Sequence, residues 1–315
     1  AAEALLRPVA ARAPKSDAAL ELGLLMHMLG RRDAKAVLES VATLADTSND
    51  PGEVARAARA LRALGRFEEA NAAFREAASG LAGDPSVQTG WGELFLEKYN
   101  TADALKSFQM AIQVDSRWTP ALLGAAKALE EDNPPQAVTL AKRALEVNPS
   151  YVDALVFLAG EAADAGHHDE AKESLDKALA VNPSSLDAHA LRAAIAFVAD
   201  KPQEFDAEVA KVLAIAPNNA DVYLAAGELA AHNYRFDEAV DLTRRALALD
   251  TTNYRAQADL GVQLLRTGDE PGARAALEAA FKADPYSKLT LNLLTMMDNL
   301  EKFVTVRDGD LVIRL

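Results

Sequence analysis

The sequence predicts an all-α fold: a right-handed α-solenoid of about eight helix pairs, with a C-terminal capping helix and a terminal β-hairpin stub. Three observations predict it. A helix-stopping motif returns every 34 residues over the second half of the chain. Between the stops, apolar residues recur at the spacing of a helix face. Alanine, which favours helix and leaves room for close packing, makes up 67 of the 315 residues.

The stops are Asn-Pro or Asp-Pro pairs or their equivalents, and they follow similar runs of residues such as RALEVNP and KALAVNP. The residue before a proline is disfavoured in the α conformation, so each pair predicts the end of a helix. Upstream, stops at Ser116 and Asp84 continue the pattern at spacings slightly shorter than 34 residues, and we assign the missing residues to shorter loops. The stops that are spaced by 34 residues are Pro149, Pro183, Pro217, Thr251 and Pro285.

Residues 152–185 illustrate the helix pair that we predict for each repeat. Gly166 separates the two helices, and Asp169 and Glu170 begin the second helix, where negative charge favours the helix dipole. The predicted apolar faces consist of Leu155, Leu158, Ala159 and Ala162 in the first helix, and of Ala171, Leu175 and Ala178 in the second. Small residues on these faces allow the two helices to approach closely.

Small residues recur at three fixed places in the repeats. The middle of the first helix carries Gly92, Ala126, Ala159, Ala193, Gly227 and Gly261. The start of the second helix carries Ala70, Ala104, Ala137, Ala171, Ala239 and Ala273, and its later turn carries Ala77, Ala111, Ala144, Ala178, Ala246 and Ala280. This pattern resembles the tetratricopeptide repeat (TPR) over most of the chain. The resemblance implies stacked helix pairs and a role in protein–protein interaction.

Two repeats depart from the pattern. The repeat at 186–219 has Phe205 and Val212 where alanine is expected, which predicts shifted helix packing. The first repeat, at about 16–49, matches through Gly23, Gly30 and helical periodicity. We therefore assign residues 16–286 to the solenoid.

The two ends differ from the repeats. Residues 1–15 form an N-terminal segment with a short helix interrupted at Pro8. Residues 287–302 predict a helix that caps the last repeat, as solenoids require. An alternative is that its Met296–Met297 pair forms part of a partner groove. The apolar residues of this helix are Leu289, Leu293, Met296, Met297 and Leu300.

Residues 303–315 (FVTVRDGDLVIRL) predict a β-hairpin, because Asp308-Gly309 separates two alternating runs. A lone hairpin is marginal in water, so we expect a β-containing domain to follow Leu315. The stretch that ends in this hairpin resembles the junction in bacterial TPR proteins that carry a gluzincin zinc metallopeptidase domain. The HExxH motif of that domain is absent from this chain. The resemblance implies a larger enzyme of which this chain is a non-catalytic part.

Composition excludes several classes of protein. With 47 acidic and 33 basic side chains, the net charge is −14, which argues against nonspecific nucleic-acid binding. The absence of cysteine excludes disulfide scaffolds, thiol nucleophiles and thiolate zinc sites. No apolar run is long enough to span a membrane. We expect a soluble bacterial protein, and its composition suits periplasm and cytoplasm equally.

The search for catalytic chemistry yields no catalytic, cofactor-binding or metal-binding residue. Neither a phosphate-binding glycine loop nor a GxSxG elbow is present. The cluster His167-His168-Asp169-Glu170 lies in a predicted turn, where adjacent side chains diverge, and we interpret it as a solvated turn rather than a weak metal site. Carboxylate pairs such as Glu130-Glu131 are interpreted as solvated helix faces.

The first helix of each pair is expected to line the concave face, where solenoids bind their partners. The candidate peptide-binding residues are Asp153, Val156, Asp187, Ala190, Phe197, Asp221, Leu224, Glu228 and Arg255. Upstream, the same side carries Arg59 and Arg62, then Glu93 and Glu97, then Lys127 and Glu131. The middle repeats lack the lysine, arginine and asparagine of TPR domains that bind a C-terminal carboxylate. They also lack the asparagine ladder of the sugar-transferase relatives, with Phe157, Leu191, Ala225 and Asp259 at those places.

An acidic edge around small and apolar residues predicts a basic, apolar helix or peptide as partner, bound in the concave groove. The predicted function is a non-catalytic protein-interaction scaffold. The chain's own missing C-terminal domain is an alternative occupant of the groove. Two alternative functions remain: presentation of substrates to a zinc metallopeptidase in the larger protein, and self-association of the TPR array.

Overall fold

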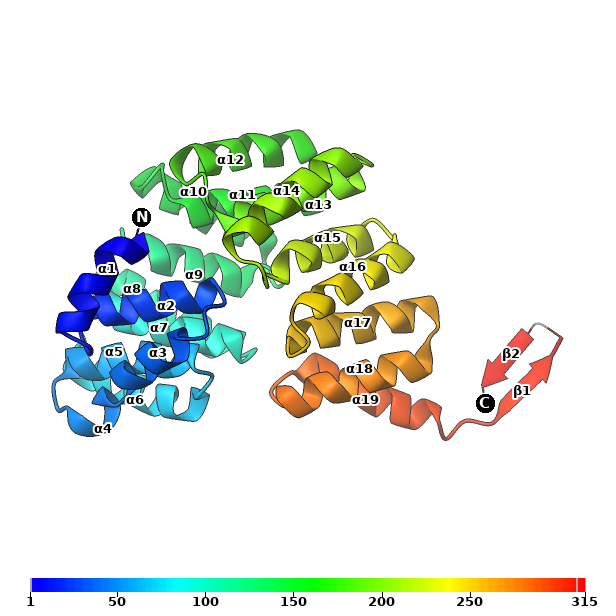
Figure 1. Ribbon diagram of the computed structural model, residues 1–315. Helices are drawn as coiled ribbons and strands as arrows, with labels where there is room; N and C mark the ends of the chain where they lie inside the picture. Colours follow the sequence, from blue (N-terminus) through cyan, green and yellow to red (C-terminus); the bar gives the residue numbers. More distant parts are fainter. Residues whose placement is uncertain (1, 310, 315) are drawn as a thin grey trace. The chain divides into compact units, whose positions relative to one another are not determined.

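The structure is a computed structural model that describes residues 2–309 and 311–314. Its helices follow one another as antiparallel pairs (Figure 1). The helices are α1 (Ala2–Arg12), α2 (Asp17–Met28), α3 (Ala34–Ala42), α4 (Leu44–Thr47), α5 (Pro51–Ala63), α6 (Phe67–Gly80), α7 (Pro85–Glu97), α8 (Thr101–Val114), α9 (Thr119–Leu129), α10 (Pro134–Val147), α11 (Val152–Asp164), α12 (His168–Val181), α13 (Leu186–Val198), α14 (Pro202–Ile215), α15 (Asp221–His232), α16 (Phe236–Leu249), α17 (Tyr254–Thr267), α18 (Glu270–Ala283) and α19 (Lys288–Leu300).

The chain divides into two compact units, which we describe separately. The N-terminal unit comprises residues 1–192 and 210–219, and the C-terminal unit comprises residues 193–209 and 220–315. The division falls within the repeat at 186–219, the one in which aromatic and branched residues replace the expected alanines. The predicted all-α fold of helix pairs is confirmed, and the repeat period is visible in the helix starts: α15, α17 and α19 begin at residues 221, 254 and 288.

Where a predicted stop carries Asn or Asp, that side chain closes the turn between repeats. The Oδ1 atom of Asn148 accepts a hydrogen bond from the Ser150 amide at 3.1 Å, and Asn182 and Ser184 repeat this bond at 3.1 Å. Asp250 accepts from the Thr252 amide at 2.9 Å. These side chains mimic a backbone turn, which explains why the motif returns with the period.

The turn inside most of the helix pairs contains a residue in the left-handed region. Gly65, Gly166 and Gly268 have φ values of 73°, 77° and 85°. Tyr99, one repeat after Gly65, and Tyr234, one repeat before Gly268, occupy the same conformation with φ values of 57° and 61°. Left-handed backbone is costly for a residue with a Cβ atom, so these tyrosines strain the turns that they occupy. The predicted turn glycines mark this position only in some repeats.

The core lies between the paired helices and consists largely of alanine with a few large side chains. Phe74 and Phe108 are buried, with exposed fractions of 1% and 0%. The Phe108 ring lies so close to Gly92 and Gly124 that an added Cβ would approach ring carbons within 2.7 and 2.3 Å. Glycine is therefore required where the first helices α7 and α9 pack against this ring.

The repeat at 186–219 packs through aromatic rings, as its departure from the alanine pattern predicts. Phe205 is buried, and its ring meets that of Phe197 edge-on with centroids 5.4 Å apart. Tyr223 of α15 lies against the same ring at 6.3 Å. The Arg245 guanidinium covers the Tyr223 ring at 4.3 Å, a favourable cation–π distance. A large ring thus takes the place of the small-residue contact.

At the C-terminus, β1 (Thr305–Asp308) pairs antiparallel with β2 (Leu311–Arg314), with Val306 opposite Ile313. This is the segment in which the sequence predicts a hairpin. Leu315, after which the sequence predicts a further β-containing domain, lies outside the described residues. At the other end, α1 continues through Pro8 without a break, although an interruption was predicted there. Among the described residues, no helix has both the length and the apolar character needed to cross a bilayer.

Candidate functional site

Helix α15 leaves one narrow face uncovered. Of its twelve residues, only Asp221, Ala225, Glu228 and His232 are exposed or half-buried, and the other eight are buried. The spacing of four, three and four residues places these side chains on one face of the helix. Surrounding helices thus enclose α15 except along this line, and it is the surface that α15 offers to a partner.

The same positions stay uncovered in the next two first helices of the C-terminal unit. We call these twelve residues the uncovered face, and all of them are exposed or half-buried. The face consists of Asp221, Ala225, Glu228 and His232 of α15, of Arg255, Asp259, Val262 and Arg266 of α17, and of Leu289, Leu293, Met296 and Leu300 of α19. Each member lies one repeat length from its counterpart in the neighbouring first helix.

In the N-terminal unit the predicted candidates lie on α11 and on the first part of α13. Asp153 and Asp187 are exposed, and Val156 is half-buried. Asp153, Asp187 and Asp221 share one position in the repeat, and all three have side chains in contact with solvent. An acidic residue at the start of the first helix is thus a feature of both units.

Two candidates do not line an open surface. Ala190 and Leu224 are buried, with exposed fractions of 4% and 8%. Their chain neighbours Leu191 and Ala225 are half-buried and accessible instead. One residue corresponds to a rotation of about 100° around a helix, so the predicted register was shifted by one position at these two places.

Phe197 is half-buried, and its ring is already engaged within the C-terminal unit. Besides its contact with Phe205, it packs under the Arg235 guanidinium at 4.9 Å. Arg235 also donates a hydrogen bond to Asp200 at 3.1 Å. These contacts give Phe197 a role in packing in addition to the predicted one.

Two carboxyl groups of the uncovered face have raised pKa values, because neighbouring protein atoms partly shield them from water. Burial raises the pKa of Asp259 to about 6, and the positive charge of Arg255 partly offsets this effect. The pKa of Asp221 is also raised by burial, against the attraction of Arg255, and nearby Asp250 adds to the increase. The negative charge of this face therefore grows as the pH rises through the Asp259 pKa, which makes it more attractive to a cation.

A second group of carboxylates lies on α9 and α11 in the N-terminal unit. The pKa of Glu130 is raised, first by burial and then by Glu161, although Lys127 counteracts the shift. The pKa of Glu161 is raised by burial and by Asp164. Neighbouring negative charges disfavour the ionised form of both groups, so this surface also favours positive charge.

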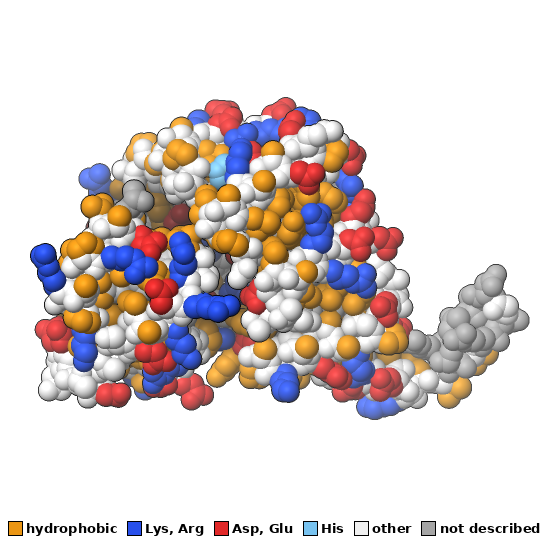
Figure 2. All heavy atoms as spheres, viewed as in Figure 1, with side chains coloured by type: hydrophobic (Ala, Val, Ile, Leu, Met, Phe, Trp, Pro, Cys, Tyr) orange, Lys and Arg blue, Asp and Glu red, His pale blue; other side chains and the backbone are white. Residues whose placement is uncertain are grey.

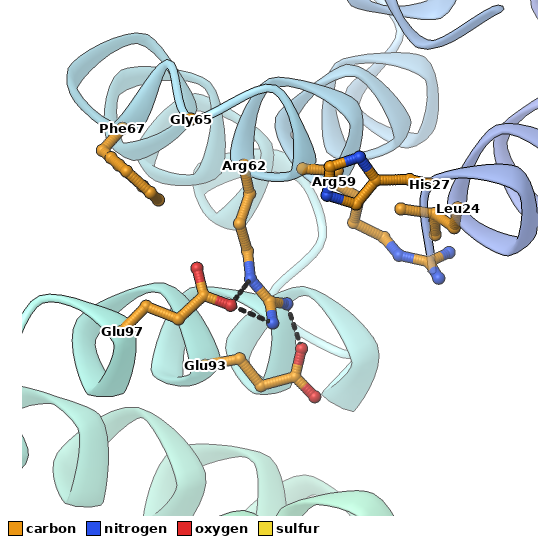
Figure 3. Close-up of a pocket in the computed structure, with 9 residues that line it drawn as sticks. Leu24, His27, Arg59, Arg62, Gly65, Phe67, Glu93 and Glu97 are labelled. Atoms are coloured by element: carbon orange, nitrogen blue, oxygen red, sulfur yellow. Dashed lines mark hydrogen bonds and ion pairs between the residues drawn. The ribbon is translucent and has the colours of Figure 1, made fainter. Parts of the chain in front are cut away.

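A pocket of about 450 Å³ opens in the N-terminal unit where α2, α5 and α7 meet (Figure 3). Arg62 extends from α5 between Glu93 and Glu97 of α7, and its Nε atom donates to Glu97 at 2.8 Å. It also pairs with Glu93. Burial disfavours the Arg62 charge, but both carboxylates outweigh this effect and raise the pKa of Arg62.

The positive charges of the pocket are already neutralised. Arg59, on the same helix as Arg62, donates to Glu21 of α2 at 2.9 Å. Each guanidinium therefore ties α5 to a neighbouring first helix, which leaves no excess of positive charge for an anionic ligand. The sequence placed Arg59, Arg62, Glu93 and Glu97 on one side of the solenoid. It did not indicate that His27 and Leu24 of the first repeat complete the pocket.

Charges of both signs are interspersed over the face shown in Figure 2. Among the described residues, no group of three or more His, Asp or Glu side chains could hold a metal ion. His167 at the N-cap of α12 and Glu170 in its first turn are 4.0 Å apart, and both are exposed.

Comparisons with known proteins agree with this architecture. Residues 128–195 match the family model described as tetratricopeptide repeat. None of the curated proteins compared with the chain matches it. A chain of the APC/C hetero-tetramer Cut9–Hcn1 is similar, with 15% identity and a TM-score of 0.59 over 94% of this chain. A tetratricopeptide repeat protein from Parabacteroides merdae is similar with 18% identity and a TM-score of 0.54, covering 78% of this chain and 99% of that one.

The chain spans 58% of the length of the Cut9–Hcn1 chain that it matches. At these identities the two solved structures establish the fold. The periodic stops, the small residues between paired helices and the family match lead to the same assignment. Residues 128–195 are tetratricopeptide repeats, and the chain has the helix-pair fold of tetratricopeptide repeat proteins.

Proposed function

We propose that this protein is a non-catalytic scaffold that binds a basic and apolar helix or peptide on the uncovered face. TPR proteins generally act as protein-interaction scaffolds, and the fold supports this broad role. The observation that carries the finer proposal is the enclosure of α15, whose only accessible side chains are those of Asp221, Ala225, Glu228 and His232. A partner of α15 must meet this line.

The charge of the face supports a basic partner. Asp221 and Glu228 are exposed on α15, and Asp259 adds a carboxyl group on α17. Asp153 and Asp187 place further carboxylates at the same repeat position in the N-terminal unit. With a net charge of −14, the whole chain attracts cationic partners and speeds their association.

Small and apolar residues between the charges support the apolar part of the proposal. Ala225 and Val262 lie between charged neighbours on α15 and α17. A short side chain leaves room for an inserted side chain of the partner. An amphipathic helix that presents apolar anchors at positions i, i+3, i+4 and i+7 fits such a surface.

A titration tests the proposal. We label a leucine–lysine peptide with helical spacing and follow its fluorescence anisotropy with the full chain at about 50 and 300 mM salt. Screening weakens contacts between exposed charges, so we expect weaker binding at high salt. Binding that is absent, or unaffected by salt, would refute the proposed acidic recognition.

A matched pair of variants locates the effect. Asp221→Asn removes a carboxylate from the uncovered face, whereas Asp241→Asn removes one from the outer surface of α16, where its side chain is 76% exposed. We expect weaker binding and a smaller salt effect for Asp221→Asn. The Asp241→Asn variant should bind as the unaltered protein does. Equal effects would indicate general electrostatic attraction.

A further inference from the structure

Helix α19 occupies the first-helix position of a repeat, but its chemistry on the uncovered face differs from that of the helices before it. It begins one repeat length after α17, and the N-caps Asn253 and Ser287 keep the same spacing. The residues at the four uncovered positions are Leu289, Leu293, Met296 and Leu300. We call these four side chains the leucine–methionine stripe.

The other side of α19 is firmly packed. Thr290 and Met297 are buried, with exposed fractions of 1% and 5%, and Met297 belongs to the core cluster that includes Leu277 of α18. Arg274 of α18 reaches across to α19 and donates to Asp298 at 2.8 Å. Leu293 of the stripe packs against the same cluster, so the stripe is held in place by contacts along one of its edges.

The stripe itself remains accessible. Leu289 is 62% exposed and Met296 is 43% exposed, while Leu293 and Leu300 are half-buried. Capping a solenoid requires a polar outer side, and α19 meets this need with the exposed Asn292, Thr295 and Asn299. The apolar stripe exceeds what capping requires, and its exposure costs free energy unless a partner covers it.

The uncovered face changes in character across the three helices of the C-terminal unit. It is acidic on α15 through Asp221 and Glu228, mixed on α17 through Arg255, Asp259 and Arg266, and apolar on α19. Figure 1 shows α15 to α19 stacked in chain order within this unit. A ligand that crosses these helices therefore meets charge at one end and a hydrocarbon surface at the other.

We propose that the leucine–methionine stripe binds the apolar end of an amphipathic partner segment whose basic end lies on Asp221 and Glu228 of α15. This inference rests on the function proposed above, and it adds the direction of the partner and the class of side chain bound at each end.

A second copy of the chain fits this surface less well. Each copy carries a net charge of −14, so two acidic faces would repel one another. A stable dimer buries roughly 20–30 residues on each side, and the stripe has four. A basic segment satisfies both the acidic and the apolar end.

The experiment uses the full chain and two labelled helical peptides, each long enough to span the path from α15 to α19. One has leucines in its first half and lysines in its second half, and the other has serine in place of the leucines. The test variant is Leu289→Gln with Met296→Gln, which keeps good helix formers on α19. The control is Leu291→Gln, because Leu291 is 47% exposed on the same helix but lies outside the stripe.

We expect the double variant to bind the leucine–lysine peptide at least ~10-fold more weakly, which corresponds to about 1.4 kcal/mol. The Leu291→Gln variant and the unaltered chain should bind equally. The serine peptide should bind weakly to all three proteins, because it lacks the apolar end. This pattern would support both the site and the orientation.

Three outcomes would overturn the inference. If Asp221→Asn weakens binding but Leu289→Gln/Met296→Gln does not, the function stands and the assignment of the stripe fails. If sedimentation shows a concentration-dependent mass that the double variant abolishes, the stripe binds a second copy instead. If the leucine–lysine peptide binds none of the proteins, the proposed function fails as well.

Discussion

Two glycine-to-alanine substitutions should have opposite effects on stability, because Gly124 packs against the Phe108 ring and Gly160 faces open space. Gly124 is buried in the middle of α9, and Gly160 is half-buried inside α11. A Cβ atom at Gly124 would lie 2.3, 2.5 and 2.6 Å from three carbons of the Phe108 ring. A Cβ atom at Gly160 would have no neighbour within 4 Å.

The expected magnitudes follow from these distances. Replacing glycine by alanine inside a helix gains about 1 kcal/mol of helix stability. At Gly124 the ring must move by more than about 1 Å to restore ordinary contact, and Gly92 also packs so closely against the ring that a Cβ atom there would lie 2.7 Å from a ring carbon. Overpacking of this kind costs about 1–3 kcal/mol, so after the helix gain Gly124→Ala should lose up to about 2 kcal/mol overall. Gly160→Ala should gain about 0.5–1 kcal/mol.

Urea unfolding followed by circular dichroism measures both variants, and hydrogen exchange in α8 and α9 locates the loss. The variant Phe108→Leu removes ring atoms and should relieve the clash. Combined with Gly124→Ala, it should destabilise by about 1 kcal/mol less than the sum of the two single changes. A stabilising Gly124→Ala, or strictly additive effects, would refute the argument that this ring requires glycine on both sides.

Three further predictions concern pH, the pocket and the strained turns. For Asp259, the pKa of about 6 in the folded protein exceeds its ordinary value of 3.8, so the free energy of unfolding should fall as pH rises from about 4 to 6. Asp259→Asn should remove this decline and raise the free energy of unfolding at pH 7 by roughly 1–2 kcal/mol. Urea unfolding at pH 4 and pH 7 measures the effect, and an unchanged pH dependence of stability would contradict the role of Asp259. Arg62→Met leaves Glu93 and Glu97 without their shared cation and should lower stability by about 1 kcal/mol. Arg59→Met removes a more exposed ion pair and should cost less than about 0.5 kcal/mol. Thermal unfolding measures both variants, and equal losses of stability would refute this difference. Tyr234→Gly should raise stability by about 0.5–1 kcal/mol because it relieves a left-handed residue that is 82% exposed, and a lower melting temperature would show that the turn is unstrained.

The sequence predicts the repeat architecture well because period, turn and helix pairing have local causes. Asn148, Asn182 and Asp250 close turns with their own side chains, so the stops can be read without knowledge of the rest of the fold. The replacement of alanine by Phe205 also predicts the altered packing of its repeat. The left-handed conformation of Tyr99 and Tyr234 could not be foreseen from residue type, although their spacing of one repeat from turn glycines was available as a signal.

The candidate site is predicted less fully because accessibility depends on neighbouring helices. The sequence placed Asp153, Asp187, Asp221, Glu228 and Arg255 at positions where the structure shows exposed side chains. It assigned Ala190 and Leu224 to the open surface, although Leu191 and Ala225 are the accessible residues. Helical spacing defines a face to within about one residue, and the packed partners decide which edge is covered. The larger metallopeptidase remains a prediction from the C-terminal resemblance.

The most direct test of the central claim is methyl NMR of the full chain during titration with the leucine–lysine peptide. Ala225, Val262 and Leu293 report on the uncovered face of α15, α17 and α19, and Ala248 and Ala279 report on exposed positions of the second helices α16 and α18. Binding to the uncovered face predicts shifts for the first three residues and none for the last two. Shifts at Ala248 and Ala279, with Ala225, Val262 and Leu293 unchanged, would contradict the account.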